Sequence, residues 1–120
     1  MIKTCYLRTH YIKLKRNIPT AHININNEIN KAINDGYTRF VTGIGGEADI
    51  IFAEIVNASK KFYPNINLEI QIPNIQLLEK LKDDCIFSRL FEICDAVSVL
   101  RDNPDGEQPQ LFDETRYIDL

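Results

Sequence analysis

The segment VTGIGGEADI, residues 41–50, joins a β-branched run to the start of a helical pattern through three of the five glycines in the chain. Before it, residues 37–42 have the aromatic and β-branched content of a strand. After it, apolar side chains recur on one face over residues 48–62, which predicts an amphipathic helix. A strand followed by a glycine turn and a helix is typical of α/β proteins, so this segment sets the expected fold class.

Strand-like and helical patterns alternate on both sides of this segment. The further predicted strands are short apolar or β-branched runs, at residues 2–8, 68–72 and 96–100. The further predicted helices have apolar side chains at helical spacing, at residues 19–34, 77–81 and 87–93. Two stretches without a period, residues 9–19 and 103–110, are predicted as loops, and the last eight residues are predicted to begin a helix.

The resulting order is β-α-β-α-β-α-β over a chain of 120 residues, which is a length for one domain. Strands separated by helices pair in parallel through right-handed crossovers. We therefore expect a single α/β domain over residues 1–120. Its architecture should be a Rossmann-like, three-layer open sheet, mostly parallel, with helices on both faces.

Composition excludes several classes of function. The net charge of −3 gives no general attraction for nucleic acid or anionic lipid, so we expect neither as a partner. The sequence has no apolar run long enough to span a membrane and no apolar centre of a signal peptide near its start, which favours the cytoplasm. The cysteines, Cys5, Cys85 and Cys94, are odd in number and widely spaced, so we expect reduced thiols and no metal site.

The glycine turn permits two interpretations. Glycines let a backbone approach a ligand, and the free N–H groups at a helix start bind anions, so the turn could hold a phosphate. However, the letters GIGG match neither GxGxxG nor a P-loop, and Glu47 adds a negative charge there. A tight connection between strand and helix that binds no ligand therefore remains an alternative to the phosphate site.

Three further side chains could serve such a site. Asp49 and Glu54 follow the turn and could act on a glycosidic bond or on ribose hydroxyls, or could instead stabilise the helix start and its surface. His10 follows the first strand, also at a carboxyl end, and could face the same crevice. A lone histidine can equally be structural, so a binding role and a structural role both remain possible for His10.

Five segments of the chain match one pattern in order. AI-x-x-G-Y-x-x-F-[IV]-[ST]-G matches residues 32–43, and D-x-x-A-A-E-I-V is similar to residues 49–56. K-x-x-Y-P-x-I-x-L matches residues 60–68, C-D-x-V matches residues 94–97, and the final R-Y matches Arg116-Tyr117. In these motifs the chain resembles the YpsA-like branch of the SLOG superfamily, which includes Smf/DprA proteins and the lonely-guy phosphoribohydrolases. The resemblance covers nearly the whole chain and is specific over residues 32–68.

The resemblance implies a Rossmann-like fold, an oligomer, and a site for a nucleotide or nucleotide-derived ligand. The ligand-binding residues that it implies, together with the turn, are Thr9, His10, Thr42, Gly43, Gly45, Gly46, Asp49, Glu54 and Arg116. The branch motif T-G-H-R-P is reduced here to His10, its arginine being Tyr11, and Glu47 replaces a glycine. Branch members also continue beyond the point that corresponds to Leu120, so we expect a shortened or fragmentary member.

Three functions follow from these observations. The favoured one is a non-catalytic binding module for a nucleotide or nucleotide-derived small molecule, without cofactor and as a homo-oligomer. The second is an interaction protein that keeps the fold and binds no ligand. The third is a hydrolase of nucleotide N-glycosidic bonds that uses Asp49 and Glu54, although the hydrolase signature P-G-G-x-G-T is missing.

Overall fold

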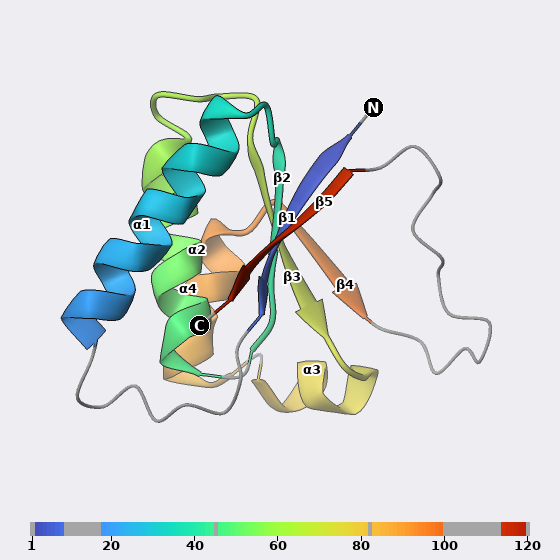
Figure 1. Ribbon diagram of the computed structural model, residues 1–120. Coiled ribbons are helices and arrows are strands. Elements are labelled where there is room, and N and C mark those ends of the chain that lie inside the picture. Colours follow the sequence, from blue (N-terminus) through green and yellow to red (C-terminus); the bar gives the residue numbers. More distant parts are fainter. Residues whose placement is uncertain (1, 9–17, 45, 82, 100–113, 120) are drawn as a thin grey trace.

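Five strands and four helices form the computed structural model, which describes residues 2–8, 18–44, 46–81, 83–99 and 114–119 (Figure 1). The strands are β1 (Lys3–Arg8), β2 (Arg39–Thr42), β3 (Asn67–Ile72), β4 (Ala96–Val99) and β5 (Glu114–Asp119). The helices are α1 (Ile18–Asn34), α2 (Glu47–Ser59), α3 (Ile75–Leu81) and α4 (Cys85–Ile93).

The five strands form one sheet in the order β4-β3-β2-β1-β5, and every neighbouring pair is parallel. The chain moves outward from β1 through β2 and β3 to β4, and β5 then lies on the other side of β1. The strand order thus reverses at β1, which is the topological switch point of an open α/β sheet. The predicted α/β, Rossmann-like class with a parallel sheet is confirmed.

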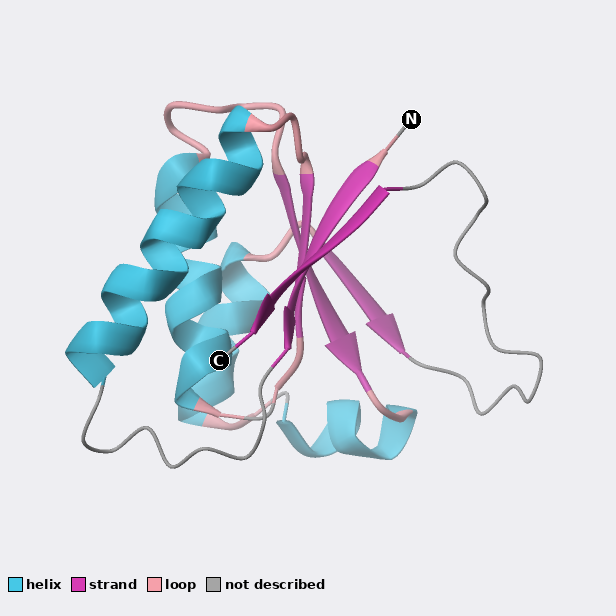
Figure 2. Ribbon diagram, viewed as in Figure 1, coloured by secondary structure: helices cyan, strands magenta, loops and turns pink. Residues whose placement is uncertain are grey.

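The three longest helices, α1, α2 and α4, lie on the same side of the sheet (Figures 1 and 2), so they do not show the predicted placement on both faces. Right-handed crossovers that step in one direction, here from β1 to β4, put their helices on one face. Their apolar faces meet the alternate side chains of the strands that point the same way, because successive strand residues face opposite sides. The buried core residues at this contact include Ile25, Ile29, Phe40, Phe52, Leu68, Ile70 and Leu90. Helix α3 lies where β3 ends (Figure 1).

The predicted stop of the first helix at Gly36 is confirmed. Helix α1 ends at Asn34, and Gly36 has a φ of 89°. That backbone conformation is strained for residues with a Cβ and is the usual way for a helix to end.

Residues 114–119 form a strand, so the predicted helix start there is wrong. Strand β5 pairs with β1 over six residues, from Lys3 opposite Glu114 to Arg8 opposite Asp119. Ile118 points into the core and is 2% exposed, whereas its neighbours Tyr117 and Asp119 are exposed. This alternation has the period of a strand, and six residues are too few to form a stable helix without tertiary contacts.

The second helix is shorter than predicted, because α2 ends at Ser59 instead of residue 62. The N–H groups of Phe62 and Tyr63 both donate to the Ser59 carbonyl, which closes a turn. Pro64 follows, and a proline disfavours helical backbone at the preceding residue. Phe62, predicted on the buried face of the helix, is 80% exposed.

The three cysteines are all free, but they differ in exposure. Cys5 is buried, Cys94 is half-buried and Cys85 is exposed. Burial raises the pKa of the Cys5 thiol to about 12, and burial also raises the pKa of Cys94. The expected reduced thiols are therefore consistent with the fold, although Cys85 is not buried.

We predict that Ile118→Ala lowers the free energy of unfolding by about 2–4 kcal/mol, because it leaves a cavity between β5 and the helices. Ile75→Ala is the matched control, since Ile75 is 59% exposed on α3. Urea unfolding of both variants measures the difference. An equal effect of the two substitutions would show that β5 is not packed on the core.

Thiol labelling should follow the burial of the cysteines. The thiolate is the reactive form, so Cys85 should react with a disulfide reagent first, Cys94 more slowly and Cys5 only on unfolding. Folding raises the pKa of the Cys5 thiol from 9.0 to about 12, so the folded state holds this proton more tightly than the unfolded state. The resulting contribution of Cys5 to the free energy of unfolding is complete below about pH 9 and is lost as the pH rises toward 12. Mass spectrometry of labelled peptides checks the order, and native labelling of Cys5 at the rate of Cys85 would contradict it.

Candidate functional site

The turn between β2 and α2 is organised around the Asp49 carboxylate, which is buried and 4% exposed. One of its oxygens accepts hydrogen bonds from the Thr42 hydroxyl at 2.5 Å and from the Gly43 N–H at 3.2 Å. The other oxygen accepts from the Gly46 N–H at 3.0 Å. Asp49 therefore ties the last residue of the strand to the residue that precedes the helix.

The local sequence explains this arrangement. Asp49 is the third residue of α2, where a carboxylate can reach back to the backbone of the N-cap residue and interacts favourably with the helix dipole. Its own N–H donates to the Gly46 carbonyl at 3.2 Å, so the two residues are bonded reciprocally. The helix start is capped by a carboxylate from within the helix.

The two described glycines of this turn, Gly43 and Gly46, differ in the space beside them. Gly46 has an extended φ of 168°, which any residue can adopt, and a Cβ there would meet no atom of the described residues within 4 Å. A Cβ on Gly43 would make ordinary contacts, at 3.9 Å, with Asp49 and the Gln71 carbonyl. Backbone conformation and packing in the described residues therefore do not require glycine at either position.

The structure brings Thr42, Gly43, Gly46 and Asp49 together, but it places Glu54 elsewhere. Glu54 lies further along α2 and pairs with Arg89 of α4, with 2.9 Å between the carboxylate and the guanidinium Nε. This hydrogen bond raises the pKa of Arg89. The two acids considered for hydrolysis thus do not form a pair.

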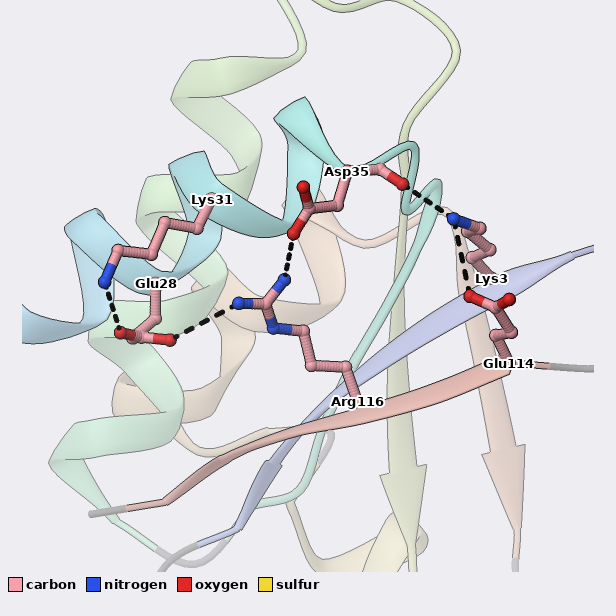
Figure 3. A network of polar contacts seen from close by, with 6 residues as sticks. All are labelled: Lys3, Glu28, Lys31, Asp35, Glu114 and Arg116. Atoms are coloured by element: carbon pink, nitrogen blue, oxygen red, sulfur yellow. Dashed lines mark hydrogen bonds and ion pairs between the residues drawn. The ribbon is translucent and has the colours of Figure 1, made fainter.

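Arg116 lies away from the glycine turn, in a network near the amino ends of the strands (Figure 3). Its guanidinium is 2.7 Å from an Asp35 carboxylate oxygen and 3.9 Å from Glu28. The hydrogen bond to Asp35, just after α1, raises the pKa of Arg116. Lys3 donates to the Asp35 carbonyl at 2.8 Å, so this network fastens β1 and β5 to the end of α1.

The remaining predicted site residues, Thr9, His10 and Gly45, lie outside the described residues.

A second polar cluster lies at the carboxyl ends of β1 and β5, where the strand order reverses. Arg8 makes a double contact with Asp119, at 2.5 and 3.1 Å, and this hydrogen bonding raises the Arg8 pKa. The Arg8 guanidinium lies 4.5 Å from the Tyr117 ring centre, and Tyr117 stacks on Tyr6 at 5.6 Å. Sequence reasoning missed this cluster, because it depends on the pairing of β5 with β1.

Two further features bear on the chemistry of the molecule. Among the described residues, no group of three or more histidine, cysteine, aspartate or glutamate side chains is placed to hold a metal ion. Within the same part of the chain, no helix is long and apolar enough to cross a membrane.

The fold and the turn define the chain as an α/β protein with a carboxylate-capped glycine turn at the carboxyl edge of a parallel sheet. A comparison with protein-family models gave no match, and a comparison with curated proteins gave none either.

We predict that Asp49→Ala lowers the free energy of unfolding by about 2–4 kcal/mol, because the buried Thr42 hydroxyl and the partly buried Gly43 N–H lose a charged acceptor. Glu47→Ala, at an exposed position in the same helical turn, should cost less than about 1 kcal/mol. Chemical unfolding of both variants gives the comparison. Similar losses for the two acids would show that the turn does not depend on Asp49.

Proposed function

We propose that this protein is a non-catalytic binding module for a nucleotide or nucleotide-derived small molecule, which binds beside the glycine turn after β2. The observation that carries the proposal is the turn itself, in which Asp49 accepts hydrogen bonds from the end of β2 and from the N-cap residue of α2, at the carboxyl end of a parallel sheet. Ligands of open α/β sheets bind at that end of the strands. The resemblance to the SLOG superfamily supports the class of ligand.

The space beside Gly46 supports contact between a ligand and the backbone. A Cβ at this position would meet no atom of the described residues within 4 Å, and glycine leaves the backbone accessible for close approach. The hydrogen bonds of Gly43 and Gly46 to Asp49 also lower the entropic cost of binding, since the ligand does not have to order these two residues.

The charges of the turn favour a neutral part of the ligand. Asp49 already accepts the N–H groups of Gly43 and Gly46, which a phosphate would otherwise use. Glu47 adds a second, exposed carboxylate to the same helical turn. The carboxylates of Asp49 and Glu47 would repel a phosphate, because all three groups are negatively charged. A ribose or base, with its N–H and O–H donors, therefore fits the turn better than a phosphate.

Binding without catalysis fits the arrangement of the acids. Hydrolysis of an N-glycosidic bond requires acid and base groups that face the substrate. Asp49 is occupied by the turn, and Glu54 is paired with Arg89 on α4. The proposal therefore contains no catalytic residue.

A panel of nucleosides and their 5′-monophosphates tests the proposal through the midpoint of thermal unfolding. We expect at least one nucleoside to raise the midpoint in a concentration-dependent way, at least as strongly as its monophosphate. Gly46→Trp should abolish the shift, because the indole fills the space beside the turn. Glu92→Trp, at an exposed site on α4, is the matched control and should keep it.

A shift that survives Gly46→Trp would contradict the site, and a shift with monophosphates alone would contradict the proposed orientation.

An interaction protein that keeps the fold without a ligand is the second candidate. The internal use of two turn N–H groups by Asp49 favours it, because these donors are not free for an anion. This candidate predicts that no compound of the panel changes the unfolding midpoint. The same experiment therefore separates the two functions.

A further inference from the structure

The ion pair between Arg8 and Asp119 lies where the topology of the sheet places a ligand crevice. Arg8 is the last residue of β1 and Asp119 is the last residue of β5, and the two are direct partners in the strand register. The strand order reverses at β1, which has β2 on one side and β5 on the other. In open α/β sheets the ligand binds outside the carboxyl ends of the strands at this switch point.

Contacts from two directions orient the pair. Arg8 donates to both carboxylate oxygens of Asp119, at 2.5 and 3.1 Å. The Arg8 guanidinium also lies 4.5 Å from the ring centre of Tyr117, which stacks on Tyr6 with 24° between the ring planes. Both side chains of the pair are nevertheless 51% exposed. A ligand therefore meets a guanidinium and a carboxylate that are oriented before it binds.

The pair presents donors and acceptors side by side. A guanidinium has five N–H donors and a carboxylate has about four lone-pair sites, so the contact between them exhausts neither group. A sugar hydroxyl both donates and accepts. Two neighbouring hydroxyls can consequently donate to Asp119 and accept from Arg8 at the same time. Because the two charges balance, the pair favours such a neutral diol over a phosphate.

Only one strand separates the pair from the glycine turn. β2 pairs with β1 and β1 pairs with β5, so the carboxyl ends of β2 and β5 lie about 10 Å apart across the sheet. Ile118 points into the core, so its neighbour Asp119 projects from the face opposite the helices. A nucleoside that lies across the strand ends, with its base at the turn, brings its ribose toward the pair.

We propose that the Arg8–Asp119 pair binds the 2′ and 3′ hydroxyls of a ribose, which makes the ligand a ribonucleoside and excludes its 2′-deoxy form. The inference rests on the proposed function, which supplies the base, and adds the sugar as a second contact. The hydroxyls donate to the Asp119 carboxylate and accept from the Arg8 guanidinium. Tyr117 and Tyr6 support the guanidinium and do not contact the sugar.

Matched pairs of nucleosides test the proposal by isothermal titration. The probes are adenosine, guanosine, cytidine and uridine, each with its 2′-deoxy form. We expect a ribonucleoside to bind at least about tenfold more tightly than its 2′-deoxy form, since a hydrogen bond to a charged group is lost. Asp119→Ala should remove this difference by weakening the ribonucleoside alone.

Glu114→Ala is the matched control, because Glu114 lies at the other end of β5 and pairs there with Lys3. It should leave both affinities unchanged. The midpoint of thermal unfolding should hardly move in Asp119→Ala, since exposed ion pairs contribute little to stability. A binding role is thereby separated from a structural one.

A sugar without a base separates this inference from the proposed function. Methyl β-D-ribofuranoside should shift the NMR signal of the Arg8 Nε–H group, and methyl 2-deoxy-β-D-ribofuranoside should not. A shift of this signal when no nucleoside binds would support the sugar site and contradict the base site at the turn.

Two results would overturn the inference. The first is equal binding of ribonucleosides and their 2′-deoxy forms that Gly46→Trp still abolishes, which leaves the proposed function intact. The second is an absence of binding by every nucleoside together with an unchanged Arg8 signal, which overturns both.

Discussion

The Asp49 carboxylate, with its hydrogen bonds from Thr42, Gly43 and Gly46, is the interaction on which the rest of the structure depends. It joins the end of β2 to the start of α2 and so sets the direction in which the helix leaves the sheet. That direction brings Phe52 onto Phe40, with 6.2 Å between ring centres. Because the carboxylate is buried, the core around it can form only if these donors are in place.

The same interaction shapes what the turn can bind. In many α/β proteins the free N–H groups of this turn receive a phosphate, whereas here an internal carboxylate takes two of them. Thr42, Gly43 and Gly46 are consequently hydrogen-bonded to Asp49 before any ligand binds, and the negative charge of the turn favours neutral hydrogen-bond donors. A phosphate group would have to find a cation elsewhere. Arg8, at the carboxyl end of β1, which pairs with β2, is a cation at this edge, but it is already paired with Asp119.

Part of the site could be predicted from the sequence, because its members are close neighbours along the chain. Thr42, Gly43, Gly46 and Asp49 lie within eight residues, and a strand, a turn and a helix in succession place them together. Arg116 could not be placed in this way, since its position depends on Asp35 and Glu28, which are distant in sequence. Phe62 was predicted on the buried face of α2, but the helix ends at Ser59 and Phe62 lies in the turn that follows.

The sequence by itself determined the alternation of strands and helices, the turn and the α/β class, because these depend on local spacing and on residues that favour particular backbone conformations. Only the tertiary structure decided that the last described residues form β5. The pairing of Arg8 with Asp119 spans 111 positions, and the burial of Ile118 requires the completed helix layer. No local pattern encodes such contacts, because six residues gain their hydrogen bonds and burial only when β1 and the helices are already in place.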